Sequence, residues 1–121
     1  MSQDLFKGIN RVKDPANPTD LEKKHVPTIE APDTVRRGEP FEVKVTVGKE
    51  LSHPDEGGHH IQWLELFAGE AFLSRVDFTP TVSTSPVCLT LKLFEDTTLR
   101  AIARCNLHGM WESEKAVQVT S

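Results

Sequence analysis

Residues 41–47 read Phe-Glu-Val-Lys-Val-Thr-Val, so apolar and polar side chains alternate at every step. A period of two residues is typical of a β-strand that buries one face and exposes the other. Further runs with strand character, separated by turn residues, occupy residues 28–31, 61–68, 71–78, 87–93, 99–103 and 116–120. About seven short strands without a convincing amphipathic helix predict an all-β fold, an Ig-like antiparallel β-sandwich.

Length and composition limit the architecture and the class of protein. The 121 residues suffice for one domain with a single core. We expect residues 1–24, which contain two prolines and no sustained period, to be an irregular N-terminal segment with one helical turn at most. Residues 25–121 would then form the β-sandwich, with the strongest loop candidates at residues 48–60 and 106–113.

Charge and cysteine content exclude several partners and compartments. A formal net charge of −4 argues against a general nucleic-acid binder. No apolar run is long enough for a signal peptide or a membrane span. Two cysteines, Cys88 and Cys105, do not make a disulfide framework and favour a reducing compartment. We therefore expect a cytoplasmic protein that binds neither nucleic acid nor membranes, and we expect no role for Cys88.

Cysteine and histidine side chains form the clearest chemical pattern. Cys105 and His108 are three residues apart, a spacing that can bring sulfur and nitrogen to one metal ion. Upstream, His25 precedes the strands, and His53 and His59 lie in a loop rich in glycine. Imidazole and thiolate ligands together favour iron, copper or zinc over magnesium or calcium. The sequence therefore predicts a transition-metal site.

Three motifs, the second of which has two parts, carry a resemblance to a known family. They read Lys-His-Val-Pro at 24–27, Val-Gly-Lys-Glu-Leu-Ser-His-Pro at 47–54, His-His-Ile-Gln-Trp-Leu-Glu-Leu at 59–66 and Cys-Asn-Leu-His-Gly-Met-Trp at 105–111. In order, internal spacing and surrounding strands they resemble the motifs of superoxide reductases, and more closely those of the one-iron form called neelaredoxin. The two-iron relatives, the desulfoferrodoxins, have an additional cysteine-rich domain, whose cysteines are absent from this sequence.

The resemblance implies a ligand set, a reaction and partners. One iron ion per chain would have an axial thiolate from Cys105 and four equatorial nitrogens, from His25, His53, His59 and His108. The open sixth position would bind superoxide, which the family reduces by one electron to hydrogen peroxide without producing dioxygen, as protection against oxidative stress. The resemblance also implies a small electron donor such as rubredoxin and a homo-oligomer, with a tetramer favoured. His60 has no ligand counterpart, and we expect it to be structural or solvent-facing.

Two charged residues before the first histidine are candidates for catalysis. Lys24 matches the family lysine that attracts superoxide and supports protonation. Glu22 is a doubtful sixth ligand, because the family's glutamate stands two residues before the first histidine ligand and Lys23 occupies that position here. An extended backbone would turn Glu22 to the other side. Replacing it should leave the ferric thiolate band nearly unchanged.

Three further residues are expected to lie around the metal. Trp63 and Trp111 flank ligand-bearing loops, and we expect both to pack near the site. The backbone N–H of Asn106, or those of the residues after it, could donate to the sulfur of Cys105 and tune the metal.

Two other interpretations stay open from the residues alone. A blue-copper electron carrier is also a β-sandwich, and Cys105, His108 and Met110 imitate its C-terminal ligand loop. Met110 is only two residues beyond His108, however, and this interpretation leaves at least two histidines unexplained. An Ig-like adhesion module, metal-free or stabilised by zinc, would make the histidines incidental, and chelation would then change stability alone.

Overall fold

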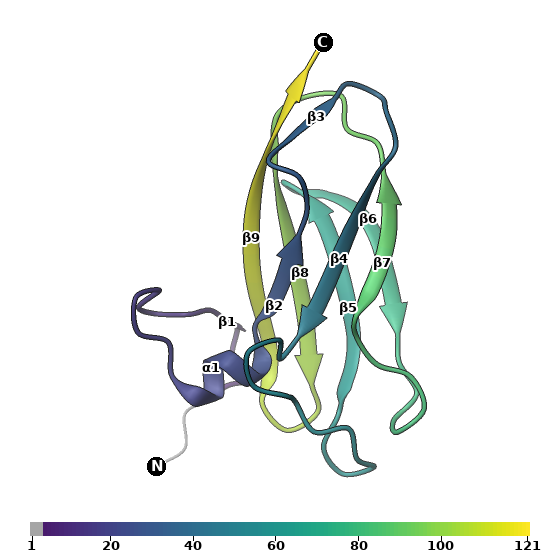
Figure 1. The fold of residues 1–121 in the computed structure, drawn as a ribbon. Helices are drawn as coiled ribbons and strands as arrows, with labels where there is room; N and C mark the ends of the chain where they lie inside the picture. Colours follow the sequence, from purple (N-terminus) through teal and green to yellow (C-terminus); the bar gives the residue numbers. More distant parts are fainter. Residues whose placement is uncertain (1–3) are drawn as a thin grey trace.

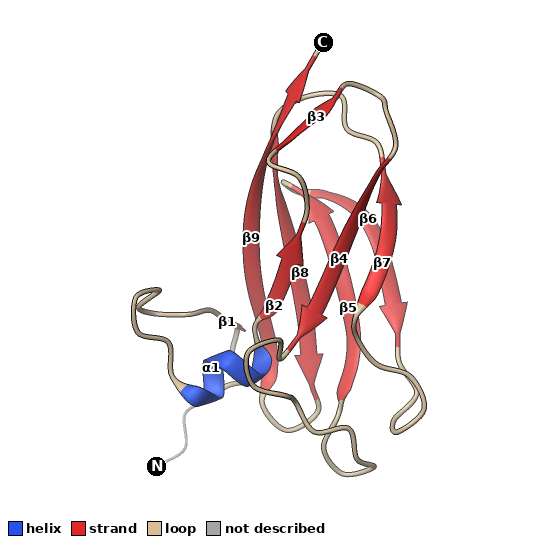
Figure 2. Ribbon diagram, in the orientation of Figure 1, coloured by secondary structure: helices blue, strands red, loops and turns tan. Residues whose placement is uncertain are grey.

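Two β-sheets packed face to face form the body of the protein, as Figures 1 and 2 show. The structure is a computed structural model that describes residues 4–121. One sheet contains β2 (Pro27–Glu30), β4 (Phe41–Val47) and β7 (Val87–Leu91), in the order β2-β4-β7. The other has the order β1-β9-β8-β5-β6, with β3 paired to β9. Its strands are β1 (Ile9–Asn10), β3 (Thr34–Arg36), β5 (Ile61–Ala68), β6 (Ala71–Asp77), β8 (Thr97–Cys105) and β9 (Gly109–Thr120). The predicted all-β sandwich is confirmed.

The core between the sheets follows the alternation in the sequence. In β4, Val43 and Val45 are fully buried, while Lys44 between them is exposed. On the opposite sheet, every second residue of β8 from Leu99 onward is buried, and Cys105 is the last of this series with 0% exposure. The register of β8 therefore places the thiol at one end of the apolar core.

The C-terminal strand differs from the prediction. We expected residues 106–113 to be a loop, but β9 begins at Gly109 and pairs with β8 immediately after the turn, so that Gly109 lies opposite Cys105. Gly109 adopts a φ of +78°, a conformation that glycine reaches without steric cost. A Cβ there would also collide with the carbonyl of Leu5. The hairpin is therefore tight, and the N-terminal segment packs against its turn.

Residues 4–26 have no regular structure except for the two-residue strand β1 and one helix. Helix α1 (Asp20–His25) has six residues, more than the single turn that we expected. The Thr19 hydroxyl accepts from the Glu22 backbone N–H, and the Glu22 carboxylate accepts from the Thr19 N–H. This capping box satisfies two N–H groups at the helix start and explains why the helix forms.

Three ligand-bearing segments meet at the same end of the sandwich, the lower end in Figure 1. They are the end of α1, the loop between β4 and β5, and the turn between β8 and β9. Among the described residues, no helix has the length and apolarity needed to cross a membrane.

Candidate metal centre

Four imidazoles form a closed square at this end of the sandwich. Neighbouring ring centroids are 4.7 Å apart for His25 and His53, 4.7 Å for His53 and His59, 5.1 Å for His59 and His108, and 4.8 Å for His108 and His25. The diagonal from His25 to His59 is 6.3 Å. All four neighbouring pairs meet edge to face, at 66° to 82°. The rings therefore surround a common point.

The thiol of Cys105 lies against this square. Its Sγ is 3.3 Å from Nε2 of His53 and 3.7 Å from Nδ1 of His108. One potential ligand atom from each of His25, His53, His59 and Cys105 lies within 4.8 Å of the others. Nδ1 of His108 is 3.1 Å from Nε2 of His25. The structure thus brings together the five residues that the sequence singled out.

Gly48 allows two of the three segments to approach each other. Its φ is +71°, and a Cβ at this position would lie 2.8 Å from the backbone N of His53 and 2.9 Å from the carbonyl oxygen of Lys24. Contacts that short require the backbone to move. Any side chain here would therefore separate the end of α1 from the loop that carries His53. This role of Gly48 was not predicted, although a glycine directly after a strand was a signal.

Hydrogen bonds to main-chain carbonyls orient two of the imidazoles. Nδ1 of His25 lies 2.7 Å from the carbonyl oxygen of Leu21, and Nδ1 of His53 lies 2.6 Å from that of Pro54. Because a carbonyl only accepts, each Nδ1 must carry the proton, which leaves the Nε2 lone pair directed into the square. Nε2 of His59 is buried and has no hydrogen-bond partner among the described residues. A metal ion would satisfy it.

The electrostatics of the site also fit a cation. Burial lowers the pKa of His25 and that of His53 to about 4, so both rings are neutral at physiological pH. The pKa of His108 is lowered as well, first by burial and then by His59. Burial raises the pKa of the Cys105 thiol, and the backbone N–H groups of Leu107 and His108 oppose this rise. Neutral imidazoles can bind a metal ion directly, and the thiol can ionise when a bound cation balances the negative charge of the thiolate. Together they form a metal-binding set.

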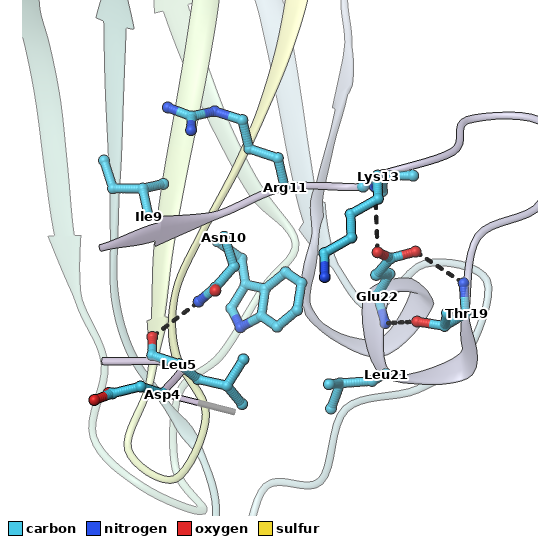
Figure 3. A pocket seen from close by; sticks show the side chains of 11 residues that line it. Asp4, Leu5, Ile9, Asn10, Arg11, Lys13, Thr19, Leu21 and Glu22 are labelled. Atoms are coloured by element: carbon cyan, nitrogen blue, oxygen red, sulfur yellow. Dashed lines mark hydrogen bonds between the residues drawn. The ribbon is translucent and has the colours of Figure 1, made fainter. Parts of the chain in front are cut away.

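The two candidate catalytic residues lie in different environments. Lys24 is in the last turn of α1, with an exposed side chain. Glu22 is buried, and its carboxylate accepts from the backbone N–H groups of Thr19, at 2.9 Å, and Lys13, at 3.2 Å (Figure 3). The hydrogen bond from the Thr19 backbone is the main reason why its pKa is lowered. In this structure Glu22 caps a helix.

The residues around the cluster have distinct roles. Trp111 stacks on His25, with centroids 5.2 Å apart, and its Nε1 donates to the carbonyl oxygen of His108 at 2.9 Å. Trp63 instead packs beneath the guanidinium of Arg75, 4.7 Å from the ring centroid. His60 is buried, with Nδ1 3.1 Å from the carbonyl oxygen of Glu56. Trp111 is therefore the tryptophan that contacts the site.

A cavity of about 500 Å³, shown in Figure 3, has Trp111 among its lining residues. It is also lined by Asp4, Leu5 and residues 9–13, and by Thr19, Leu21 and Glu22 of the helix region. Leu21, whose carbonyl orients His25, is thus one of the lining residues. Helix α1 thus has the cavity on one side and the histidine cluster at its end.

Comparisons with known proteins identify the family of the chain. The sequence profile of the desulfoferrodoxin family matches residues 17–114. A protein of Methanocaldococcus jannaschii is 45% identical over 113 residues, which cover 91% of this chain and 93% of that protein. Superoxide reductase of Pyrococcus furiosus is 40% identical over 114 residues, covering 79% of this chain and 90% of its own. A solved structure of superoxide reductase (neelaredoxin) from Ignicoccus hospitalis is similar with a TM-score of 0.80 and 40% identity, covering 93% of this chain and 94% of its own. The chain therefore belongs to the desulfoferrodoxin family and shares nearly its whole length with a superoxide reductase of the neelaredoxin type.

Proposed function

We propose that the chain is a superoxide reductase of the one-iron type, which reduces superoxide by one electron to hydrogen peroxide and releases no dioxygen. The observation that carries the proposal is the square of four imidazoles beside a buried thiol. Membership of the desulfoferrodoxin family and the names of the relatives support it.

Five residues would hold the metal, and the family resemblance points to iron. Neutral imidazoles and one thiolate suit iron, copper and zinc alike, and the need for a redox metal excludes only zinc. Bound ferrous iron would supply the one electron that superoxide takes up, together with two protons, to form hydrogen peroxide. The proposed ligands are His25, His53, His59, His108 and Cys105.

The chain's own residues would prepare this chemistry in two ways. Leu21 and Pro54 fix the proton on Nδ1 of two rings, so the correct nitrogens face the metal without rearrangement. The backbone N–H groups of Leu107 and His108 stabilise the anionic form of Cys105. Such hydrogen bonds to the sulfur reduce its electron donation and so tune the potential of the metal.

Lys24 would attract the anionic substrate and support proton delivery. The protein has a net charge of −4, so a local cation is needed to draw superoxide to the site. Lys24 is exposed and directly precedes His25. Lys49, the other lysine in the motifs at 24–27 and 47–54, forms an ion pair with Glu30, which offsets its charge. The ammonium of Lys24 can donate a proton and recover it from solvent.

Glu22 would leave the sixth position free. Its carboxylate accepts two backbone hydrogen bonds in the cap of α1. Reaching the metal would require these bonds to break and the capping box of α1 to open. We therefore propose that the resting ferric site binds water or stays five-coordinate.

The partners follow from the family resemblance. We extend the proposal to a small electron donor such as rubredoxin, a homo-oligomer with a tetramer favoured, and a cytoplasmic location. The exposed side chain of Lys24 at the site end of the molecule suits an acidic carrier.

The blue-copper alternative has no support from the position of Met110. In β9, Met110 pairs with Arg104 and precedes Trp111, whose ring stacks on His25. Neighbouring residues of a strand face opposite sides, so Met110 is directed away from the cluster. A copper site would therefore lack its usual axial ligand.

Metal analysis combined with stopped-flow mixing of the reduced protein and superoxide tests the proposal. We expect bound iron, oxidation at a rate constant approaching the diffusional ceiling of about 10⁸ to 10⁹ M⁻¹s⁻¹, and about one hydrogen peroxide for each superoxide consumed. Dismutation would give half that yield and release dioxygen. Bound copper, or an iron centre that superoxide does not oxidise, would contradict the proposal.

A further inference from the structure

Asn106 connects the two loops that present His59 and Cys105. Its side-chain Oδ1 accepts from the backbone N–H of His60 at 2.8 Å, and its Nδ2 donates to the carbonyl oxygen of Gly58 at 3.0 Å. Its own backbone N–H donates to the carbonyl oxygen of His60 at 3.1 Å. Asn106 directly follows Cys105, and Gly58 and His60 directly flank His59. Three hydrogen bonds therefore join Asn106, which is next to Cys105, to the two residues that flank His59.

The segment held in this way has few other supports: just before it, residues 54–57 have one hydrogen bond to a distant part of the described chain, from the Thr81 backbone N–H to Oδ1 of Asp55 at 2.9 Å. A Cβ at Gly57 or Gly58 would have nothing within 4 Å, so this part of the loop lies in open surroundings. The backbone pair between Glu56 and His59 is internal to the loop and moves with it. The contacts of Asn106 instead reach across to the end of β8, which is anchored in the core.

His59 also differs from His25 and His53. A main-chain carbonyl holds each of those two rings, that of Leu21 for His25 and that of Pro54 for His53. In the described part of the chain, no hydrogen bond holds the ring of His59. Its position must therefore come from its backbone.

We propose that Asn106 is a positioning residue, which fixes His59 relative to Cys105 through these three hydrogen bonds. The proposal rests on the proposed metal site and adds a residue outside the ligand set. An asparagine suits this place because one planar amide offers a donor and an acceptor together. Leucine, similar in size and neutral, can form neither side-chain bond. Groups that orient metal ligands usually change metal affinity by about 10 to 100-fold when they are removed.

Cobalt(II) binding to Asn106→Leu and Asn106→Ala tests the proposal. Cobalt is the probe because its absorption reports coordination geometry and needs no reaction with superoxide. We expect both variants to bind cobalt at least about 10-fold more weakly than the unaltered protein in chelator competition, with a shifted thiolate-to-cobalt band. If the leucine and alanine variants show the same weaker binding and the same band shift, the lost hydrogen bonds cause the effect, because the two side chains differ in size.

Asn10→Leu is the matched control. The Asn10 amide donates to the carbonyl oxygens of Leu5 and Met110, so it ties the N-terminal segment to β9 without joining two ligand loops. We expect this variant to have a lower melting temperature and an unchanged cobalt spectrum. Unchanged affinity and band position in both Asn106 variants would overturn the proposal, and so would an equal spectral shift in Asn10→Leu.

Hydrogen exchange keeps the proposal testable if the Asn106 variants do not fold. In the metal-free unaltered protein, the backbone N–H of His60, which donates to Asn106, should be protected from hydrogen exchange to the same degree as the backbone N–H groups of β5. Exchange as fast as that of a free loop would overturn the proposal. If the Asn106 variants bind cobalt more weakly, as expected, but superoxide does not oxidise the iron form of the unaltered protein, the proposed reaction is refuted and the role of Asn106 is not.

Discussion

The hairpin of β8 and β9 and the loop between β4 and β5 both supply candidate ligands, but they are held in different ways. Cys105 continues the buried face of β8, and nine residue pairs align that strand with β9 up to Gly109 opposite Cys105. The loop has two consecutive glycines in open surroundings and is tied to the body by a few polar contacts. The β8–β9 hairpin thus extends the core, whereas the loop between β4 and β5 is attached to the body by polar contacts.

This difference separates two kinds of sensitivity. In the hairpin, apolar burial fixes the backbone, so a substitution of the ligand should remove chemistry and leave the fold intact. In the loop and in α1, single hydrogen bonds and one glycine determine where a ligand lies. Substitutions there should alter metal binding even when no ligand is changed.

The largest effect is expected from Cys105→Ser. This variant should lose the thiolate-to-iron absorption and the reaction with superoxide, while circular dichroism shows a folded sandwich. Cys88→Ser is the matched control, because Cys88 is an exposed free thiol on β7. Retention of both the colour and the reaction in Cys105→Ser would remove this residue from the site.

Gly48→Ala should have the next largest effect. A Cβ would lie 2.8 Å from the backbone N of His53, and the left-handed φ of +71° adds strain. Such strained positions cost of order 1 to 3 kcal/mol, and the displaced loop should weaken iron binding. Chelator competition and thermal melts measure both effects. Gly57→Ala, where nothing lies within 4 Å, should change neither, and equal behaviour of the two variants would show that Gly48 does not position the loop.

The stability of the metal-free protein should fall between pH 6.5 and pH 4. Burial lowers the pKa of His25 and of His53 to about 4 in the folded state, whereas an unfolded histidine titrates near 6.5. Below pH 6.5 the unfolded chain therefore binds more protons, and each histidine lowers the free energy of unfolding by at most about 1.4 kcal/mol per pH unit. Denaturant unfolding at several pH values measures the slope. The slope should be smaller in His53→Gln. A free energy of unfolding that does not change with pH in this range would contradict the burial of neutral rings.

Glu22→Ala should have the smallest effect on the metal. Losing a carboxylate that accepts from Thr19 and Lys13 should cost about 1 kcal/mol of stability, because the capping box of α1 keeps only the bond to the Thr19 hydroxyl. The ferric thiolate band should stay nearly unchanged. Glu39→Ala, an exposed glutamate in a long surface ion pair, serves as the control. A clear shift of the band in Glu22→Ala would show that this carboxylate does reach the iron.

The sequence predicted those parts of the fold that depend on local alternation. The period of two in residues 41–47 and the inward series of β8 identified strands whose buried faces build the core. The short strands β1 and β3 escaped prediction because each forms only by parallel pairing with the long β9, a distant partner. Helix α1 was underestimated because its signal is a single capping box that follows two prolines.

The site could be predicted only in part for a similar reason. Spacing alone paired Cys105 with His108 and left iron, copper and zinc open. The family resemblance added His25, His53 and His59, which three separate segments bring to one place. The roles of Gly48 and Asn106 depend on how close two backbones come, and no pattern within a single segment of the sequence contains that information.

The stack of Trp111 on His25 makes the protein an optical sensor of its own metal loading. The chain has only two tryptophans, and Trp63 lies beneath Arg75. A coloured, paramagnetic ion bound to His25 should quench the emission of Trp111, whose ring centroid is 5.2 Å from that imidazole. Titration with iron should therefore reduce the fluorescence to a remaining intensity that comes from Trp63. In Trp111→Phe the same titration should leave the remaining emission far less changed, and an equal loss would show that the signal comes from elsewhere.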